Sequence, residues 1–151
     1  MRSCRIPLAA VLALALAATS AVVAAADALG LPPFTTAAQS TRAVGSGQAE
    51  LFSLNAACHP SFDRIVIRTR FATPAFSAGY VREVDQPSGR PLPLPGSARL
   101  RFVVRSARAH STGGTALLPG SVTPGCPSIV QVRRAEDFEG VVVCSASASA
   151  G

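Results

Sequence analysis

The stretch Phe62-Asp-Arg-Ile-Val-Ile-Arg-Thr-Arg-Phe71 is the part of the sequence that decides the fold class. Apolar side chains occupy one side of an extended chain here, and arginines occupy the other. This period of two, together with the β-branched content, indicates a half-buried β-strand. The apolar side consists of Ile65, Ile67 and Phe71, and the charged side consists of Arg64, Arg68 and Arg70.

Other segments carry the same strand signal. Arg99–Arg105 shows it most cleanly, because apolar residues alternate there with arginines. No stretch of ten residues after the N-terminal segment has the 3.6-residue period of a helix, and Pro or Gly interrupts most of them. The sequence therefore predicts an all-β domain, a small β-sandwich of two sheets. The remaining candidate strands are Glu50–Ala57, Phe76–Val84, Ser128–Arg134 and Glu139–Cys144.

Residues 1–26 have the features of a signal peptide. Two positive charges precede a long apolar run, and the small residues before Asp27 suit signal peptidase. We therefore expect cleavage between Ala26 and Asp27, a secreted protein on the extracellular side of the cell envelope, and no stable membrane span after processing. Cleavage after Ala28 is an alternative. An uncleaved anchor is another, because Ile6–Ala26 approaches the length of about 20 residues that spans a bilayer.

Composition divides the rest of the chain into three parts. Residues 27–49 are rich in Pro, Ser, Ala and Gly without a period, which predicts a flexible leader. Residues 50–143 carry the strand patterns. Residues 144–151, Cys-Ser-Ala-Ser-Ala-Ser-Ala-Gly, contain no large side chain to pack, so we expect a disordered tail. A natural terminus and a truncated or frame-shifted chain are both compatible with such a tail.

All fourteen basic residues are arginines, and the net charge is +6. Removal of Arg2 and Arg5 with the signal peptide leaves +4. The remaining arginines are spread over residues 42–134 and form no basic stripe with aromatic platforms, which argues against nucleic-acid binding. A mild positive charge attracts anionic wall polymers or lipid headgroups, or it serves solubility alone.

Three cysteines remain after signal cleavage: Cys58, Cys126 and Cys144. An oxidising compartment favours one disulfide and one unpaired thiol. Cys58 and Cys126 are the first choice for the pair, because each lies in a loop just before an apolar run. Closing a loop of roughly 70 residues would stabilise the domain by about 4 kcal/mol in the chain-entropy model.

The segment Cys-His-Pro-Ser-Phe-Asp-Arg at 58–64 is the place to look for catalysis, through His59 and Asp63. A Cys–His pair needs the imidazole within hydrogen-bond reach of the sulfur, but adjacent side chains usually project in different directions. A structural role for Asp63 in the loop is therefore favoured. The Cys and His residues lack zinc-site spacing, and His110 is assigned no role. We predict no catalytic residue, no metal and no cofactor.

Four segments carry short motifs of moderate specificity: His59–Ile67, Ala78–Val84, Gly89–Leu100 and Asp137–Val142. In this order they resemble the AMIN-like domain family of secreted proteins and lipoproteins of actinobacteria. That family shows a His-x-x-Phe-Asp-Arg-Val-Val strand, a Gly-Tyr-x-Val segment, a Gly-x-Pro turn and a late Phe-Glu-Gly. The resemblance covers about residues 50–143 and implies structural roles for His59, Phe62, Asp63, Arg64, Gly79, Tyr80, Gly96, Phe138, Glu139 and Gly140.

The resemblance implies an envelope β-domain without a known catalytic role, similar to AMIN domains that hold amidases at the wall through peptidoglycan. It also implies a C-terminally shortened member that lacks the family's last strands, with an open sheet edge. We expect a secreted, non-enzymatic module that binds peptidoglycan, another anionic wall polymer or a protein. The rival hypotheses are a secreted enzyme that uses His59 and Asp63, and a truncated fragment without function.

The candidate binding residues of this module are Arg64, Arg68, Arg70 and Tyr80. The arginines could pair with carboxylates or phosphates, and Tyr80 could stack on a sugar. The alternative is that the arginines merely solvate an exposed sheet face.

Overall fold

The computed structural model describes residues 35–149, so the predicted signal segment and its cleavage site at Ala26–Asp27 lie outside the described residues. Within 35–149 the chain forms nine strands, and no helix there is long and apolar enough to cross a membrane. The strands are β1 (Gln39–Thr41), β2 (Ala49–His59), β3 (Phe62–Arg70), β4 (Ala75–Val81), β5 (Ala98–Arg105), β6 (Ala107–Arg108), β7 (Ser121–Val122), β8 (Ile129–Phe138) and β9 (Val141–Ala148).

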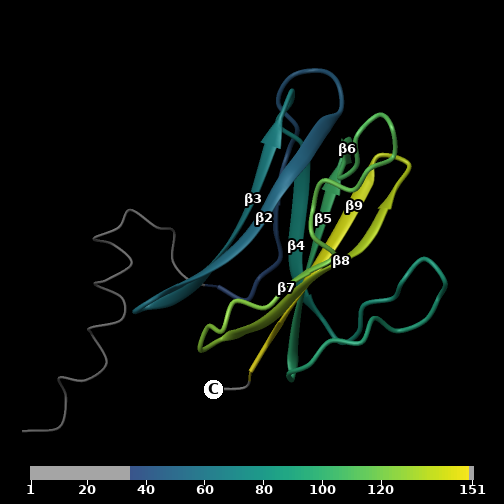
Figure 1. The fold of residues 1–151 in the computed structure, drawn as a ribbon. Helices are drawn as coiled ribbons and strands as arrows, with labels where there is room; N and C mark the ends of the chain where they lie inside the picture. Colours follow the sequence, from purple (N-terminus) through teal and green to yellow (C-terminus); the bar gives the residue numbers. More distant parts are fainter. Residues whose placement is uncertain (1–34, 150–151) are drawn as a thin grey trace, which may run out of the picture. The chain divides into compact units, whose positions relative to one another are not determined.

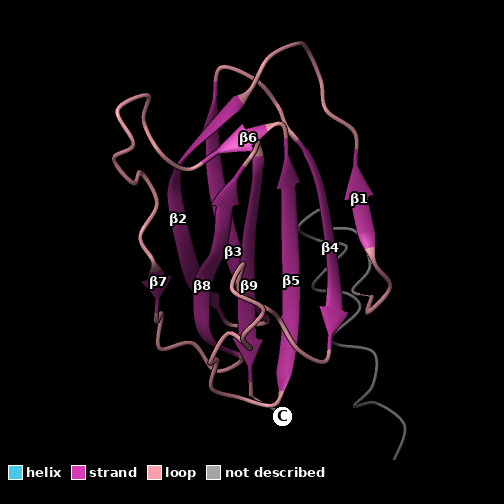
Figure 2. Ribbon diagram, turned by 90° about the vertical axis from the view of Figure 1, so that its right-hand side faces the viewer, coloured by secondary structure: helices cyan, strands magenta, loops and turns pink. Residues whose placement is uncertain are grey.

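The strands form two sheets that face one another. The larger sheet has the order β1-β4-β5-β9-β8-β7, which Figure 2 shows from right to left, and the smaller has the order β3-β2-β6. Neighbouring strands are antiparallel except β2 and β6, which are parallel. Figure 1 shows β2 and β3 as a layer on the left, beside the strands of the larger sheet. The prediction of an all-β, sandwich-like fold is confirmed.

The core lies between the two sheets and follows the predicted alternation. Ile65 and Ile67 of β3 pack against it, whereas the arginines of β3 are exposed. Phe71 was expected on the same apolar side, and this is wrong: it is 75% exposed. Its φ of 73° turns the chain out of the strand, so the ring leaves the core face. The buried centre is formed by Ala49, Leu51, Leu54, Val104, Ala107, Ala109, Leu118, Ile129, Val132, Val142, Cys144 and Ala146.

The predicted disordered tail is wrong for residues 144–148, which belong to strand β9. This strand lies between β5 and β8 in the larger sheet and pairs with both of them along its length. The six residues 142–147 are all buried. The strand therefore lies in the middle of the sheet, and the sheet edge that we expected to be open at this point is occupied.

The Ser/Ala composition of β9 is explained by cover on both faces. Cys144 and Ala146 face the core between the sheets, so Ser145 and Ser147 face the opposite side of the larger sheet. The loop of residues 82–97 covers that side (Figure 1). Both serines have no exposed surface, and their hydroxyls donate to backbone carbonyls. Small side chains that satisfy their own hydrogen bonds let a loop lie directly on the sheet.

Buried apolar side chains and two arginines hold the loop of residues 82–97 in place. Arg99 donates to the carbonyl of Leu94 at 3.4 Å, and Arg133 donates to the carbonyl of Pro93 at 2.9 Å. Residues 85–96 within this loop contain four prolines and two glycines and form no strand. The buried side chains are Val84, Leu92 and Leu94, which pack with Val81 and Ala135.

The predicted flexible leader is also partly wrong, because residues 39–41 form strand β1. This strand pairs with β4 at the edge of the larger sheet, where Gln39 lies opposite Ala78. Val44 then forms an isolated bridge with Thr73, and Ala49 is fully buried at the start of β2. Pairing with the edge of β4 orders a segment that has no periodic pattern of its own.

A disulfide and a partly buried carboxylate hold one end of the sandwich together. The disulfide Cys58–Cys126 forms as predicted and links the end of β2 to the loop before β8. Next to it, Asp63 accepts hydrogen bonds from the backbone N–H groups of Ser128 at 2.7 Å and Ile129 at 2.9 Å. Both contacts join the smaller sheet to the larger one. With a sequence separation of 68 between the cysteines, the link is worth about 4 kcal/mol in the chain-entropy model.

Candidate functional site

The arginines of β3 are exposed on the outer face of the smaller sheet, but they are not equivalent. Arg70 is paired with Glu50 of β2, and its guanidinium lies 5.6 Å from the ring centre of Phe52. Arg64 and Arg68 are exposed and have no partner among the described residues. They lie on the same side of the strand, four residues apart, which separates them by roughly 13 Å. Two cations are therefore free to meet a ligand on this face.

Glu50 is the buried centre of a row of charges across the smaller sheet. Its side chain is 5% exposed and is paired with Arg70 of β3 on one side and Arg108 of β6 on the other, the latter at 3.0 Å. The hydrogen bond from Arg108 lowers the pKa of this carboxyl, Arg70 lowers it further, and burial opposes both. The Glu50 carboxylate thus links β2 to both β3 and β6, and its ion pair with Arg70 leaves that guanidinium less available to a ligand.

Tyr80 belongs to a different sheet from the arginines. It lies on β4 opposite Leu100 and is 54% exposed. The arginines project from the outer face of β3, away from the core, whereas Tyr80 is carried by the larger sheet. The four candidate binding residues are therefore divided between two surfaces, with Arg64 and Arg68 on one and Tyr80 on the other.

The geometry around His59 and Asp63 matches a structural role. His59 stacks on Phe62 with ring centres 4.3 Å apart, and its Nδ1 lies 3.4 Å from the backbone N–H of Ser61. Asp63 is occupied by two backbone N–H groups, so it does not orient His59. Among residues 35–149, Cys58, Asp63 and Cys126 form the one cluster with metal-ligand atoms, but both sulfurs belong to the disulfide.

The backbone conformation explains why glycine occurs at two of the family-motif positions, Gly96 and Gly140. Glu139 and Gly140 form the two-residue turn between β8 and β9, with φ of 47° and 77°, values typical of a tight hairpin turn. Gly96 has a φ of 87°, and a Cβ there would lie 2.5 Å from the carbonyl oxygen of Ala148. Gly79 lies on β4 beside β1, where a Cβ would make only an ordinary contact, 3.5 Å from the Cβ of Ala38. The Glu139–Gly140 turn therefore lies at the start of β9, and Gly96 lies against its end.

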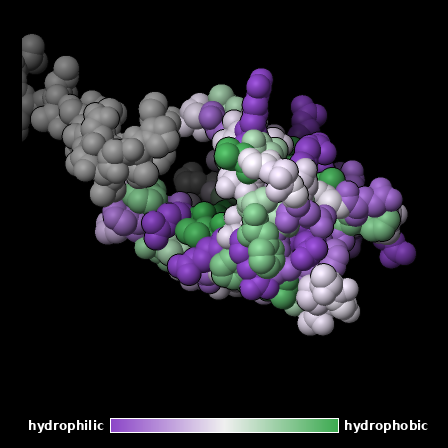
Figure 3. All heavy atoms as spheres, turned by 90° about the horizontal axis from the view of Figure 1, so that it is seen from above, coloured by the Kyte–Doolittle hydropathy of each residue, from purple (hydrophilic) through white to green (hydrophobic). Residues whose placement is uncertain are grey.

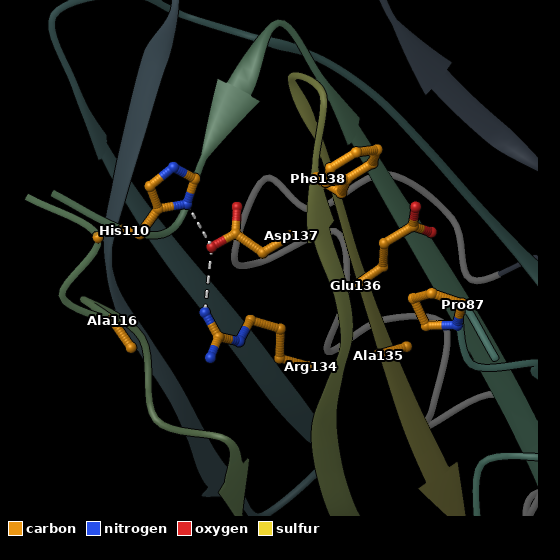
Figure 4. A pocket seen from close by; sticks show the side chains of 9 residues that line it. Pro87, His110, Ala116, Arg134, Ala135, Glu136, Asp137 and Phe138 are labelled. Atoms are coloured by element: carbon orange, nitrogen blue, oxygen red, sulfur yellow. Dashed lines mark hydrogen bonds and ion pairs between the residues drawn. The ribbon is translucent and has the colours of Figure 1, made fainter. Parts of the chain in front are cut away.

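A cleft at the opposite end from the disulfide contains a cluster of charged and polar side chains that the sequence did not reveal. Asp137 of β8 accepts hydrogen bonds from His110 Nδ1 at 2.9 Å, from Arg134 at 3.2 Å and from the backbone N–H of Ala109 at 3.0 Å. Figure 4 shows His110 and Arg134 converging on this carboxylate. The side chain of Asp137 is only 11% exposed.

The cleft has a volume of about 490 Å³ and lies at a bulge in β8, between Arg134 and Glu136. Bulges are common beside functional sites, because they redirect side chains. Seen from above, this end of the molecule carries polar and apolar side chains side by side (Figure 3). The one sequence signal for the site was Asp137, which precedes Phe-Glu-Gly. His110 is 27 residues away in a loop, so no local pattern joins them.

His110 and Asp137 have the arrangement of a general base and its orienting carboxylate, but a nucleophile is lacking. Asp137 fixes Nδ1–H of the ring, which leaves Nε2 open. No hydroxyl or thiol of the described residues bonds to Nε2. The free thiol of Cys144 on the neighbouring strand β9 is fully buried, and burial raises its pKa to about 11.

A family comparison agrees with these features. Residues 49–150 match the model of the AMIN-like domain, which includes the whole of β9. The chain belongs to the AMIN-like domain family. AMIN-like domains are of a module type associated with the cell envelope and with peptidoglycan. No curated protein and no solved structure gave a significant match to the chain.

Proposed function

We propose that this AMIN-like chain is a secreted, non-enzymatic module that binds peptidoglycan or another anionic wall polymer through Arg64 and Arg68. The observation that carries the proposal is the pair of exposed guanidinium groups on the outer face of β3, which have no partner among residues 35–149. Arginine pairs well with the carboxylates of peptides and with phosphates. Arg70 contributes less, because Glu50 already occupies it.

The face around these two arginines suits an extended polymer. Arg68 lies opposite Ser53 and Arg64 lies opposite Ala57, so short side chains flank both cations. A flat sheet surface with small neighbours leaves the guanidinium groups accessible to a chain that passes along the strand. The net charge of +4 that remains without Arg2 and Arg5 draws anionic polymers toward the protein.

Retention on purified peptidoglycan sacculi tests the proposal with a matched control. The double variant Arg64→Ser/Arg68→Ser should lose about tenfold in affinity at low salt, since two charge-assisted contacts are removed. The double variant Arg82→Ser/Arg90→Ser changes the net charge equally at exposed sites on the loop of residues 82–97, and it should bind as the unchanged protein does. Equal retention of both double variants would refute the role of β3.

A further inference from the structure

The cleft at the β8 bulge is open on the free edge of the larger sheet. Strand β7 pairs with β8 at Val132 and Arg133, and Gly120 accepts from the backbone N–H of Arg134. Beyond Arg134, no described strand covers this edge of β8. The loop between β6 and β7 forms one wall, through His110, and Pro87 forms the other. Such a cleft crosses the strand edge and admits a chain-like ligand.

The charges in the cleft disfavour an anion. Asp137 offsets the charge of Arg134 through their hydrogen bond, and His110 is bonded to the same carboxylate. Glu136 adds a carboxylate with no partner among the described residues. The two carboxylates of Asp137 and Glu136 thus face the single guanidinium of Arg134, so a ligand with hydrogen-bond donors fits the cleft better than a carboxylate or phosphate does.

The side chains that reach the ligand combine an apolar ring with hydrogen-bond acceptors. Phe138 is 63% exposed and lies with Glu136 on one side of β8, because the two are two residues apart in a strand. Figure 4 shows Pro87 on this same side and His110 on the other. The open Nε2 of a neutral His110 accepts a hydrogen bond, as does the Glu136 carboxylate. Small residues at Gly114 and Ala116 leave room between them.

We propose that this cleft is a carbohydrate-binding site for neighbouring pyranose units of a wall glycan. One sugar ring lies on the exposed face of Phe138 and donates hydroxyl hydrogens to Glu136. The next unit crosses the edge of β8 and donates to His110 Nε2, while Arg134 has donors left for a sugar oxygen. The inference rests on the proposed function as a wall-polymer binder, and it names the sugar as the part that the cleft recognises.

Titration of the purified chain with the β-1,4-linked tetramer of N-acetylglucosamine tests the site by NMR. The chain has two histidines. His110 lies in the cleft, and His59 lies beside the disulfide at the other end. The ring signals of His110 should shift with the tetramer in a saturable way, while those of His59 stay in place. A shift of His59 alone, or no shift of either, overturns the inference.

Matched variants connect the binding to the named side chains. Phe138→Ala should weaken tetramer binding about fivefold, since a stacked ring is lost, while Phe71→Ala removes another exposed ring and should leave binding unchanged. Glu136→Gln should weaken binding about threefold, and Glu139→Gln, in the adjacent turn, should not. Equal losses in variants and controls overturn the inference. Binding of lysine amide, a small cation without a sugar ring, in place of the tetramer also overturns it.

The sacculus experiment separates this inference from the proposed function. Retention on sacculi that depends on Arg64 and Arg68, without tetramer binding, contradicts the carbohydrate site alone. Absence of both retention and tetramer binding contradicts both proposals. Tetramer binding that is lost with Phe138→Ala supports the cleft, whatever the arginines contribute to retention.

Discussion

Strands β3 and β9 are opposites in both composition and surroundings. β3 lies at the edge of the smaller sheet, with Ile65 and Ile67 toward the core and Arg64 and Arg68 toward solvent. β9 lies in the middle of the larger sheet between β5 and β8, and six consecutive residues, 142–147, are buried. One strand is apolar and charged in alternation, while the other ends in serine and alanine.

The difference shows what a period-two pattern reports. Alternation of apolar and charged residues appears when one face of a strand is wet, as in β3. A strand covered on both faces has no solvent-exposed side, so its sequence does not alternate between apolar and charged residues. In β9 the core covers one face and the loop of residues 82–97 covers the other, so small residues are required at Ser145 and Ser147. A stretch of small residues can thus be the most buried strand of a sheet.

The largest effect is expected from ending the chain at Val143. This deletes most of β9, including the core residues Cys144 and Ala146, and leaves β5 and β8 without their common neighbour. The loss should exceed the about 5 to 15 kcal/mol that holds a domain of this size together. Thermal unfolding followed by circular dichroism should show no cooperative transition.

A chain that ends at Ser149 is the control for this truncation, because it keeps all nine described strands. It should unfold with the same midpoint as the full chain. Cooperative unfolding of the chain that ends at Val143, at an unchanged midpoint, would contradict the central position of β9.

A smaller effect is expected from placing valine on each strand. Ser147→Val exchanges a hydroxyl for a larger apolar branch under the loop of residues 82–97 and removes the bond to the carbonyl of Gln131. Overpacking at such a site costs about 1–3 kcal/mol. Arg68→Val on the exposed face of β3 should change stability by no more than about 0.5 kcal/mol. Urea unfolding measures both, and equal losses would mean that the two strands do not differ as described.

The sequence could predict those features of the fold that leave a local pattern of residues. The arginine alternation located β3 and β5, and the placement of Cys58 and Cys126 before apolar runs indicated their disulfide. It could not predict β1, because edge pairing with β4 orders a segment without a pattern. The cleft was equally hidden, since His110 and Asp137 meet through the packing of a long loop on β8. Long-range contacts of this kind leave no period.

The smallest effect concerns the charge row that joins β3 to its sheet. Glu50→Gln keeps the size of the side chain but removes the charge that Arg108 and Arg70 meet. Because both guanidinium groups reach solvent, the loss at neutral pH should be smaller than that of Ser147→Val. Glu139→Gln, at an exposed turn position, should leave the free energy of unfolding at pH 7 unchanged.

The pH dependence gives this last prediction its sign. The pKa of Glu50 is lowered in the folded protein, first by the hydrogen bond from Arg108. The unfolded chain therefore binds a proton at Glu50 at a higher pH than the folded chain does, and stability from this group is complete above the ordinary range of a glutamate carboxyl. As pH falls through the lowered pKa, the advantage of the unchanged protein over Glu50→Gln should disappear in urea unfolding. An advantage that stays constant or grows toward acid pH would show that the charge row does not stabilise β3, whose arginines are exposed whereas residues 142–147 of β9 are buried.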